Sequence, residues 1–205
     1  MNHKYKMLTL PKGIVKNREG TLGDLLLVVD MQNAYLEGQV WACTSTSIVT
    51  DNIIKIIEAR AVENVIFTRY IAPKNPVGTW IEYNKQYKEI NENIWLNELV
   101  ERLKPYVEYY PCYDKSVYSS YGNEEVARLC SMADRVIIAG VMAECCVLAT
   151  IQDGIDAGDK IVYLMDACSG GSKEYEEITK KIVEYHSPRC TELMTTSQFI
   201  ESKKF

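Results

Sequence analysis

The fold is decided by residues 134–165, which read DRVIIAGVMAECCVLATIQDGIDAGDKIVYLM. The apolar stretch Val136–Ala139 has the length of a strand, and Glu144–Ala157 has the composition of a helix. Gly158 is placed to end that helix in a left-handed conformation, and Lys160–Met165 is another apolar strand. A strand, a helix and a second strand in this order predict a right-handed crossover between two parallel strands.

The same alternation extends along the whole chain. Strands are predicted at Asp24–Asp30, Asn64–Tyr70, Val107–Tyr110, Asp134–Ala139, Lys160–Met165 and Glu192–Thr195. Helices are predicted at Ser45–Arg60, Glu92–Lys104, Asn123–Ser131, Glu144–Ala157 and Ser172–His186. The proline-containing stretch Ile71–Gln86 is predicted to be a loop with a short helix from Thr79. The pattern predicts an α/β three-layer sandwich, in which helices cover both faces of a mainly parallel, six-stranded sheet.

Length and composition indicate one domain over residues 1–205, of which residues 1–23 form a leading segment. A net charge of −5 gives no electrostatic basis for binding nucleic acid. Apolar runs no longer than a strand predict neither a secretory signal nor a membrane span. The seven cysteines include no C-x-x-C spacing, which favours reduced thiols and a cytoplasmic location.

Three chemically active side chains are expected at strand ends. Asp30 ends the first strand, Lys115 follows the third predicted strand, and Cys146 lies where the fourth strand turns into a helix. Ligands of parallel sheets bind at the carboxyl ends of the strands, so we expect all three in one crevice. Asp can take the thiol proton and return it to a leaving amine, while Lys holds the Asp in place. The combination indicates a nucleophilic cysteine hydrolase.

Each of these residues has a commoner explanation when it is taken singly. Asp30 is typical of a turn cap, Lys115 of a solvated loop, and Cys146 of a buried structural cysteine. The joint placement of the three favours the catalytic interpretation. A helix start and a nearby ammonium also predict an unusually low pKa for Cys146.

From about Asp24 to Ile200 the chain resembles the isochorismatase-like cysteine hydrolases. The resemblance rests on Asp30-Met31-Gln32-Asn33-Ala34-Tyr35, on Lys115 with Ser119 and Tyr121, on Gly140-Val141 followed by Cys146-Val147 and Thr150, and on Ala157-Gly158 and Asp166-Ala167. It implies a catalytic triad of Asp30, Lys115 and Cys146, and the motif spacing selects Cys146 over Cys145. It also implies a cis peptide between Val141 and Met142, an oxyanion hole formed by the N–H groups of Met142 and Cys146, and a homo-oligomer, either a dimer or a tetramer.

The resemblance also bears on cofactors. Nicotinamidase-like members of the family have histidine metal ligands after the second strand, whereas this stretch reads Thr68-Arg69-Tyr70-Ile71-Ala72-Pro73-Lys74. The chain has two histidines, His3 and His186, and both are expected at the surface. No metal ion or other cofactor is therefore expected.

The presence of Cys146 favours cleavage of a C–N bond in a small amide, carbamoyl or ureide substrate through a thioester. Two alternatives remain: a vinyl-ether hydrolase that uses Asp30 as its acid, and a catalytically idle binding or assembly protein. Candidate substrate-binding residues are Gln32, Arg69, Trp80, Tyr83, Tyr118 and Tyr121, with Arg69 placed to meet a substrate carboxylate or to form an internal salt bridge. The aromatic stretch Trp80–Tyr87 is a candidate contact surface for self-association.

Overall fold

A computed structural model describes residues 9–203, so His3 and the start of the leading segment lie outside the described residues. The strands are β1 (Asp24–Val29), β2 (Asn64–Tyr70), β3 (Cys112–Lys115), β4 (Arg135–Val141), β5 (Ile161–Ser169) and β6 (Thr191–Met194). They form one sheet in the order β3-β2-β1-β4-β5-β6, and every neighbouring pair is parallel. The predicted six-stranded α/β fold is therefore confirmed.

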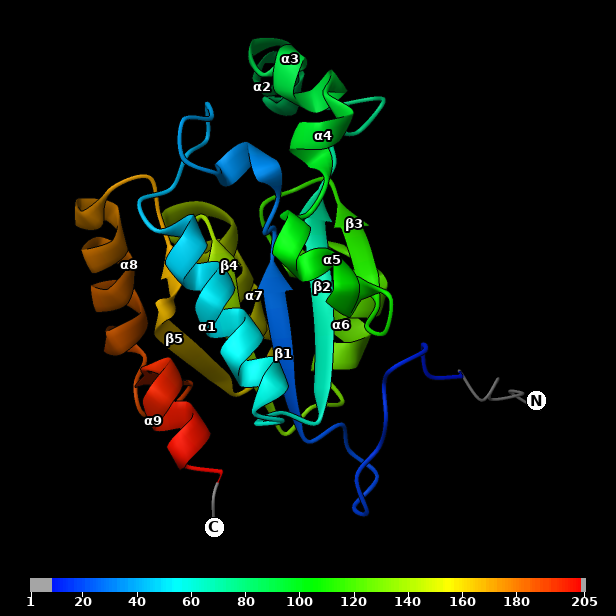
Figure 1. The fold of residues 1–205 in the computed structure, drawn as a ribbon, viewed down its shortest axis with the longest axis vertical. Coiled ribbons are helices and arrows are strands. Elements are labelled where there is room, and N and C mark those ends of the chain that lie inside the picture. The colour runs from blue at the N-terminus through cyan, green and yellow to red at the C-terminus, as the bar shows by residue number, and fades with distance from the viewer. Residues whose placement is uncertain (1–8, 204–205) are drawn as a thin grey trace.

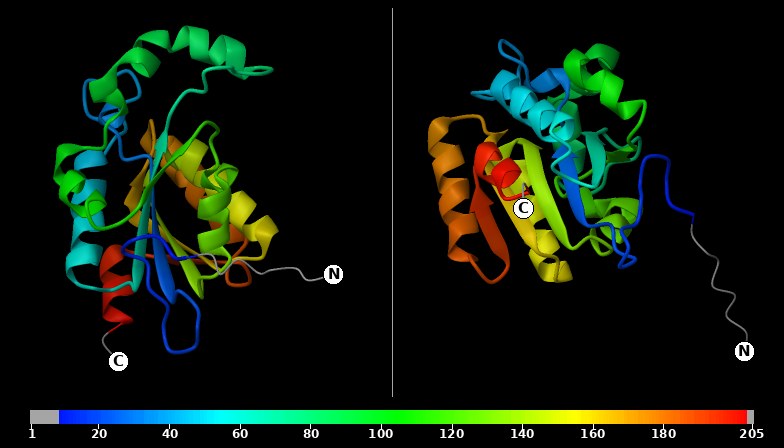
Figure 2. Two further views of the ribbon diagram at one scale, coloured as in Figure 1. Left: turned by 90° about the vertical axis from the view of Figure 1, so that its right-hand side faces the viewer. Right: turned by 60° about the horizontal axis from the view of Figure 1, so that its bottom comes forward.

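Helices cover both faces of the sheet (Figures 1 and 2). The helices that pack on the two faces include α1 (Thr46–Glu58), α6 (Glu124–Cys130), α7 (Leu148–Ala157), α8 (Lys173–Tyr185) and α9 (Thr196–Glu201). Apolar side chains of α1 and α9 pack on one face of the sheet, and those of α6, α7 and α8 pack on the other. Because β1 and β4 are covered on both sides, the side chains of β1 and those of β4 after Arg135 are all buried, as continuous apolar runs predict.

Several helices have capped ends. The Asn123 side chain accepts hydrogen bonds from two N–H groups of the first turn of α6, and the Ser172 side chain accepts one, from the Tyr175 N–H, at the start of α8. Gly158 ends α7 with φ 86°, the left-handed conformation predicted for it. Helix α9, whose first residue follows Thr195 in a capping box, was not predicted from the sequence.

The predicted third strand and the helix before it are wrong in position. The predicted helix Glu92–Lys104 is broken into α3 (Lys88–Glu92), α4 (Ile94–Asn97), a 3₁₀ turn (Glu101–Leu103) and α5 (Lys104–Val107). Pro105 lies in the first turn of α5, where its missing N–H and fixed φ are tolerated. Because of this extra helical turn, β3 begins at Cys112 instead of Val107. Lys115 is consequently the last residue of β3.

Two short helices stand above the carboxyl ends of the strands, as Figure 1 shows. They are α2 (Trp80–Gln86), which confirms the short helix predicted after the proline-containing loop, and α3. We call residues 80–92 the hood. No helix of the described chain is long and apolar enough to cross a membrane.

Candidate active site

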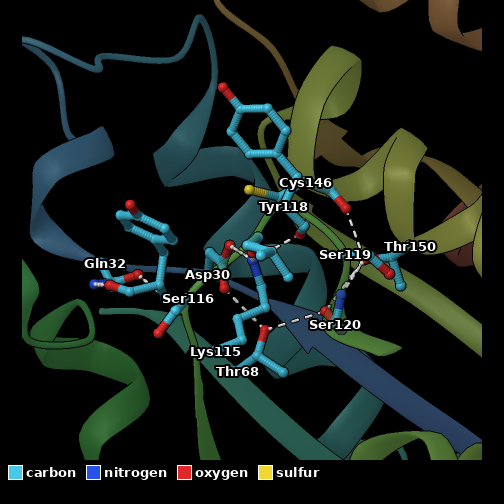
Figure 3. A network of polar contacts seen from close by, with 12 residues as sticks. Asp30, Gln32, Thr68, Lys115, Ser116, Tyr118, Ser119, Ser120, Cys146 and Thr150 are labelled. Carbon is cyan, nitrogen blue, oxygen red and sulfur yellow. Dashed lines mark hydrogen bonds and ion pairs between the residues drawn. The ribbon is translucent and has the colours of Figure 1, made fainter. Parts of the chain in front are cut away.

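The three predicted catalytic residues meet at one edge of the sheet. Asp30 directly follows β1, Lys115 ends β3, and Cys146 lies in a π-helical turn (Ala143–Val147) between β4 and α7. Strand β1 pairs with both β2 and β4, and β3 pairs with β2, so parallel pairing brings the three strand ends together. Figure 3 shows the Cys146 sulfur beside the Asp30 carboxylate and the Lys115 ammonium.

Asp30 and Lys115 form a fully buried ion pair. Lys115 Nζ lies 2.6 Å from Asp30 Oδ2, and both side chains are 0% exposed. The same ammonium donates hydrogen bonds to the backbone carbonyls of Val117 (2.9 Å) and Tyr118 (2.7 Å). These contacts use its three N–H donors. Burial alone would lower the pKa of Lys115, but the charges of Asp30 and Cys146 outweigh it and raise the pKa. Lys115 is therefore held as an ammonium ion.

The Cys146 thiol is also buried, with 4% of the residue exposed. Burial raises its pKa well above the ordinary value, and the negative charge of Asp30 raises it further, while Lys115 acts in the opposite direction. The low pKa expected from the sequence is therefore wrong for this closed arrangement. A carboxylate next to a neutral thiol suits a reaction in which the thiol loses its proton during attack.

The backbone before Cys146 has the predicted unusual geometry. The peptide between Val141 and Met142 is cis. The Met142 carbonyl accepts hydrogen bonds from the N–H groups of Cys145 and Val147, both at 3.1 Å, and this closes the turn. Gly140 has φ 130°, and a Cβ there would lie 2.1 Å from the Val29 carbonyl oxygen. Only glycine allows β4 to approach β1 this closely beneath the site.

Seven aromatic rings pack above the triad in a continuous cluster. We call this set the aromatic cluster; it comprises Tyr35, Trp41, Tyr70, Trp80, Tyr83, Tyr87 and Tyr118. Lys115 Nζ lies 5.9 Å from the centroid of the Tyr70 ring. Burial, together with charge on Cys146, raises the pKa of Tyr70 to about 12. The hood contributes three of the rings and so forms the roof of the site.

Comparison with known proteins identifies the family of this chain. The isochorismatase domain model matches residues 24–198. The chain belongs to the isochorismatase family. No curated protein matches the sequence.

Solved structures similar to this isochorismatase-family protein share its fold. A cysteine hydrolase from Pseudomonas syringae pv. phaseolicola superposes with a TM-score of 0.72 at 23% identity, over 88% of this chain and 93% of that one. An isochorismatase-like hydrolase from Alkaliphilus metalliredigens gives 0.69 at 19% identity, over 88% and 98%. A pyrazinamidase of Pyrococcus horikoshii in complex with zinc gives 0.66 at 23% identity, over 84% and 98%.

Some of the predicted substrate-binding residues lie in the aromatic cluster or bond to it, and the others contact residues elsewhere. Trp80 and Tyr118 lie in the aromatic cluster, with ring centroids 5.1 Å apart. Gln32 is buried, and its amide bonds the backbone of Tyr70 at both N–H and C=O. It therefore ties the segment after β1 to the end of β2.

Arg69 and Tyr121 are directed to other partners. Arg69 forms a salt bridge of 2.8 Å with Asp114, so it takes the internal alternative that the sequence left open. Tyr121 donates a hydrogen bond of 2.5 Å to Asp159, beyond the C-terminal end of α7. The structure thus brings neither side chain together with the aromatic cluster.

Four members of the aromatic cluster were not predicted to bind substrate: Tyr35, Trp41, Tyr70 and Tyr87, the last of which was predicted only as part of the contact stretch Trp80–Tyr87. Tyr35 stands in the motif that follows Asp30, and its place there was the one signal that could have found it. Trp41 packs against Tyr35, Tyr70, Tyr83 and Tyr87. Its position depends on the loop between Tyr35 and α1, which carries no periodic pattern.

The residues present do not offer a metal site. The described part of the chain contains no group of three or more His, Cys, Asp or Glu side chains placed to hold a metal ion. His186 follows the last residue of α8, where its ring meets that of Tyr185 edge-on, and it is half-buried. We therefore derive no catalytic step through a metal, and metal-independent activity remains a prediction.

Proposed function

We propose that this protein hydrolyses the C–N bond of a small amide, carbamoyl or ureide compound through a thioester on Cys146. The observation that carries the proposal is the buried thiol beside the Asp30–Lys115 ion pair. An acid that works alone on an ether oxygen needs no nucleophile at this position. A thiol next to a carboxylate, in contrast, has both the nucleophile and the base that acyl transfer requires.

In the first step, Cys146 Sγ attacks the substrate carbonyl carbon as its proton moves to Asp30. Lys115 stays charged and keeps the carboxylate in place. The N–H groups of Met142 and Cys146 bind the developing oxyanion. In support of this role, the Met142 N–H makes no hydrogen bond to any residue in the range 9–203.

In the second step, protonated Asp30 gives its proton to the leaving nitrogen, the C–N bond breaks, and ammonia or an amine departs. The acyl group remains on Cys146 as a thioester. Water then attacks the thioester carbonyl while Asp30 accepts a proton from it. Collapse of the second tetrahedral intermediate releases the acid product and restores the Cys146 thiol and the Asp30 carboxylate.

The surroundings of the site support a small, uncharged and flat acyl group. The aromatic cluster offers ring faces and edges, which pack well against planar groups. The positive charge of Lys115 is matched by Asp30, and Arg69 is matched by Asp114. Neither of these cations is free to bind a substrate carboxylate.

The proposed function is tested by a screen of small amides, carbamoyl compounds and ureides for release of ammonia or amine. We expect at least one uncharged compound to be hydrolysed, and we expect the activity to survive exhaustive dialysis against EDTA. Activity on a vinyl ether that persists in Cys146→Ala would support the ether hydrolase instead. Binding of these compounds without turnover by the wild type would support an idle binding protein.

We also propose a cytoplasmic location and self-association. All seven cysteines are free in the structure, which suits a reducing compartment. The rings of the predicted contact stretch, Trp80–Tyr87, pack inward on the chain's own aromatic cluster. A different surface, on α8, is therefore the better candidate for an interface between copies.

A further inference from the structure

The two carboxylate oxygens of Asp30 have different partners. Oδ2 faces the Lys115 ammonium at 2.6 Å, and Oδ1 accepts a hydrogen bond of 2.9 Å from the hydroxyl of Thr68. Thr68 lies in β2 beside the end of β1, and its carbonyl also accepts the N–H of Asp30 at 3.2 Å. Both residues are 0% exposed. Asp30 has φ 51°, a costly conformation for a residue other than glycine, and Thr68 holds it through backbone and side chain together.

A chain of buried hydroxyls connects Asp30 to the backbone of Cys146, as Figure 3 shows. The Thr68 and Ser120 hydroxyls are 3.5 Å apart, and those of Ser120 and Thr150 are 3.2 Å apart. Thr150 also lies 2.6 Å from the Cys146 carbonyl and accepts the Ser120 N–H at 2.9 Å. The base and the nucleophile are thus tied to each other through three side chains.

Counting protons fixes the direction of this chain. Each hydroxyl has one proton to donate. The Cys146 carbonyl can only accept a hydrogen bond, so Thr150 donates its proton to that carbonyl. The ionised carboxylate of Asp30 can also only accept, so Thr68 donates its proton to Oδ1. Ser120 is left to donate to Thr68, because the geometry of the Ser120–Thr150 contact does not allow Ser120 to be its donor. A hydrogen bond donated to an ionised carboxylate stabilises that form over the protonated one.

We propose that Thr68 is a positioning residue of the reaction, whose hydroxyl keeps Asp30 ionised and keeps Oδ2 directed at Lys115 and the Cys146 thiol. This proposal rests on the proposed function, in which Asp30 is the base. The other titratable groups that face Asp30 are Lys115 and Cys112 from β3, Cys146 from the π-helical turn, Tyr35 from the 3₁₀ turn Asn33–Tyr35, and Tyr70 from β2. Of these, Lys115 pairs with Oδ2, so Thr68 and Lys115 each bind one oxygen of the carboxylate.

The test is the pH dependence of Cys146 alkylation by iodoacetamide, a small primary amide, followed by mass spectrometry from about pH 4 to about pH 8. In the wild type the rate falls at low pH as Asp30 becomes protonated and can no longer accept the thiol proton. In Thr68→Val and Thr68→Ala this fall should occur about one pH unit higher, since one hydrogen bond to a charged group is lost. Thr68→Ser keeps the hydroxyl and should keep the wild-type profile.

Thr191→Val is the matched control. Thr191 is equally buried, and its hydroxyl donates to the Val183 carbonyl at 2.8 Å, away from the site. Thr191→Val should leave the pH profile of alkylation unchanged. A shift of the profile as large as that in Thr68→Val would overturn the proposal, because loss of any buried hydroxyl would then have the same effect. Two hydroxyl-free variants at position 68 keep the test possible if one of them fails to fold.

The outcomes separate the two proposals. If the wild type shows the fall at low pH and Asp30→Asn abolishes it, Asp30 acts as the base. An unmoved profile in Thr68→Val and Thr68→Ala would then overturn the role of Thr68 alone. If the wild type shows no such fall, or Asp30→Asn retains it, the role of Asp30 is overturned and that of Thr68 with it.

Discussion

Cys145 and Cys146 are neighbours in the chain with different surroundings. Cys146 is buried beside Asp30 and Lys115, whereas Cys145 is half-buried, and its pKa is raised by burial and by Glu144. We expect Cys146→Ala to reduce kcat/KM for amide hydrolysis by at least about a thousandfold, as loss of a nucleophile does. Cys145→Ala should stay within about threefold of the wild type. Steady-state kinetics of both folded variants checks this. Equal losses of kcat/KM in the two variants would mean that the nucleophile is assigned wrongly.

Single residues also show how far the sequence could predict the site. Asp30, Lys115 and Cys146 follow or end strands of one parallel sheet, and parallel pairing then brings them together. The direction of the shift in the thiol pKa could not be predicted from the sequence, because it depends on burial beneath rings that come from distant segments. Arg69 lies in the stretch after Thr68 that the sequence singled out, but its partner Asp114 lies on β3, whose position was not predicted correctly.

We expect the hood to be the element that limits access to the thiol. Tyr83 lies within 6.5 Å, between ring centroids, of Trp41, Tyr70, Trp80 and other rings of the aromatic cluster. A substrate reaches Cys146 only when such contacts open, because 4% of that residue is exposed.

We therefore expect Tyr83→Ala to speed the alkylation of Cys146 by iodoacetamide about three- to tenfold, since each aromatic pair is worth about 0.5–1.5 kcal/mol. Site-resolved mass spectrometry measures the rate. Tyr109→Ala, at a ring that is 66% exposed and outside the aromatic cluster, is the control. An unchanged rate in Tyr83→Ala would mean that the hood does not gate the site.

The elements differ in how well the sequence predicted them. Long apolar runs such as those of β1 and β4 were placed correctly, because burial on both faces leaves a continuous signal. Strand β3 has four residues at the sheet edge, and two of them are polar. The run Val107–Tyr110 is more apolar and β-prone than β3 itself, so local composition favoured the wrong segment.

Over the whole molecule, α8 presents an unpartnered apolar stripe in the described structure. Its members are Tyr175, Ile178, Ile182 and Tyr185, which are 51%, 45%, 37% and 80% exposed. Their spacing of three, four and three residues places them on one face of the helix. Exposed apolar patches of this kind mark interfaces.

We expect light scattering to give at least twice the chain mass of 23.4 kDa at micromolar concentration. The double variant Ile178→Glu/Ile182→Glu should shift the mass toward one chain. Ile48→Glu, at a residue of α1 that is 57% exposed, should not. A wild type of about one chain mass would contradict the expectation of self-association.

The stability of the folded protein should fall in alkaline solution. Burial raises the pKa of both Cys130 and Cys112 to about 12. Below the ordinary thiol pKa of about 8.5 both states are protonated, and above it only the unfolded chain releases the proton. Each such thiol should therefore cost about 2 kcal/mol of unfolding free energy between pH 8 and pH 10. Urea unfolding at the two pH values measures the loss, which Cys130→Ala should reduce. A loss as large in Cys130→Ala as in the wild type would contradict the assignment.

The central claim is that Cys146 carries the acyl group of the substrate. The most direct measurement is rapid acid quenching during turnover of an amide found in the screen, followed by peptide mass spectrometry. The account predicts an added mass equal to the substrate minus ammonia or amine, on the peptide at Cys146, present in Cys145→Ala and absent in Cys146→Ala. An adduct on Cys145, or continued hydrolysis by Cys146→Ala with no adduct in the wild type, would contradict it.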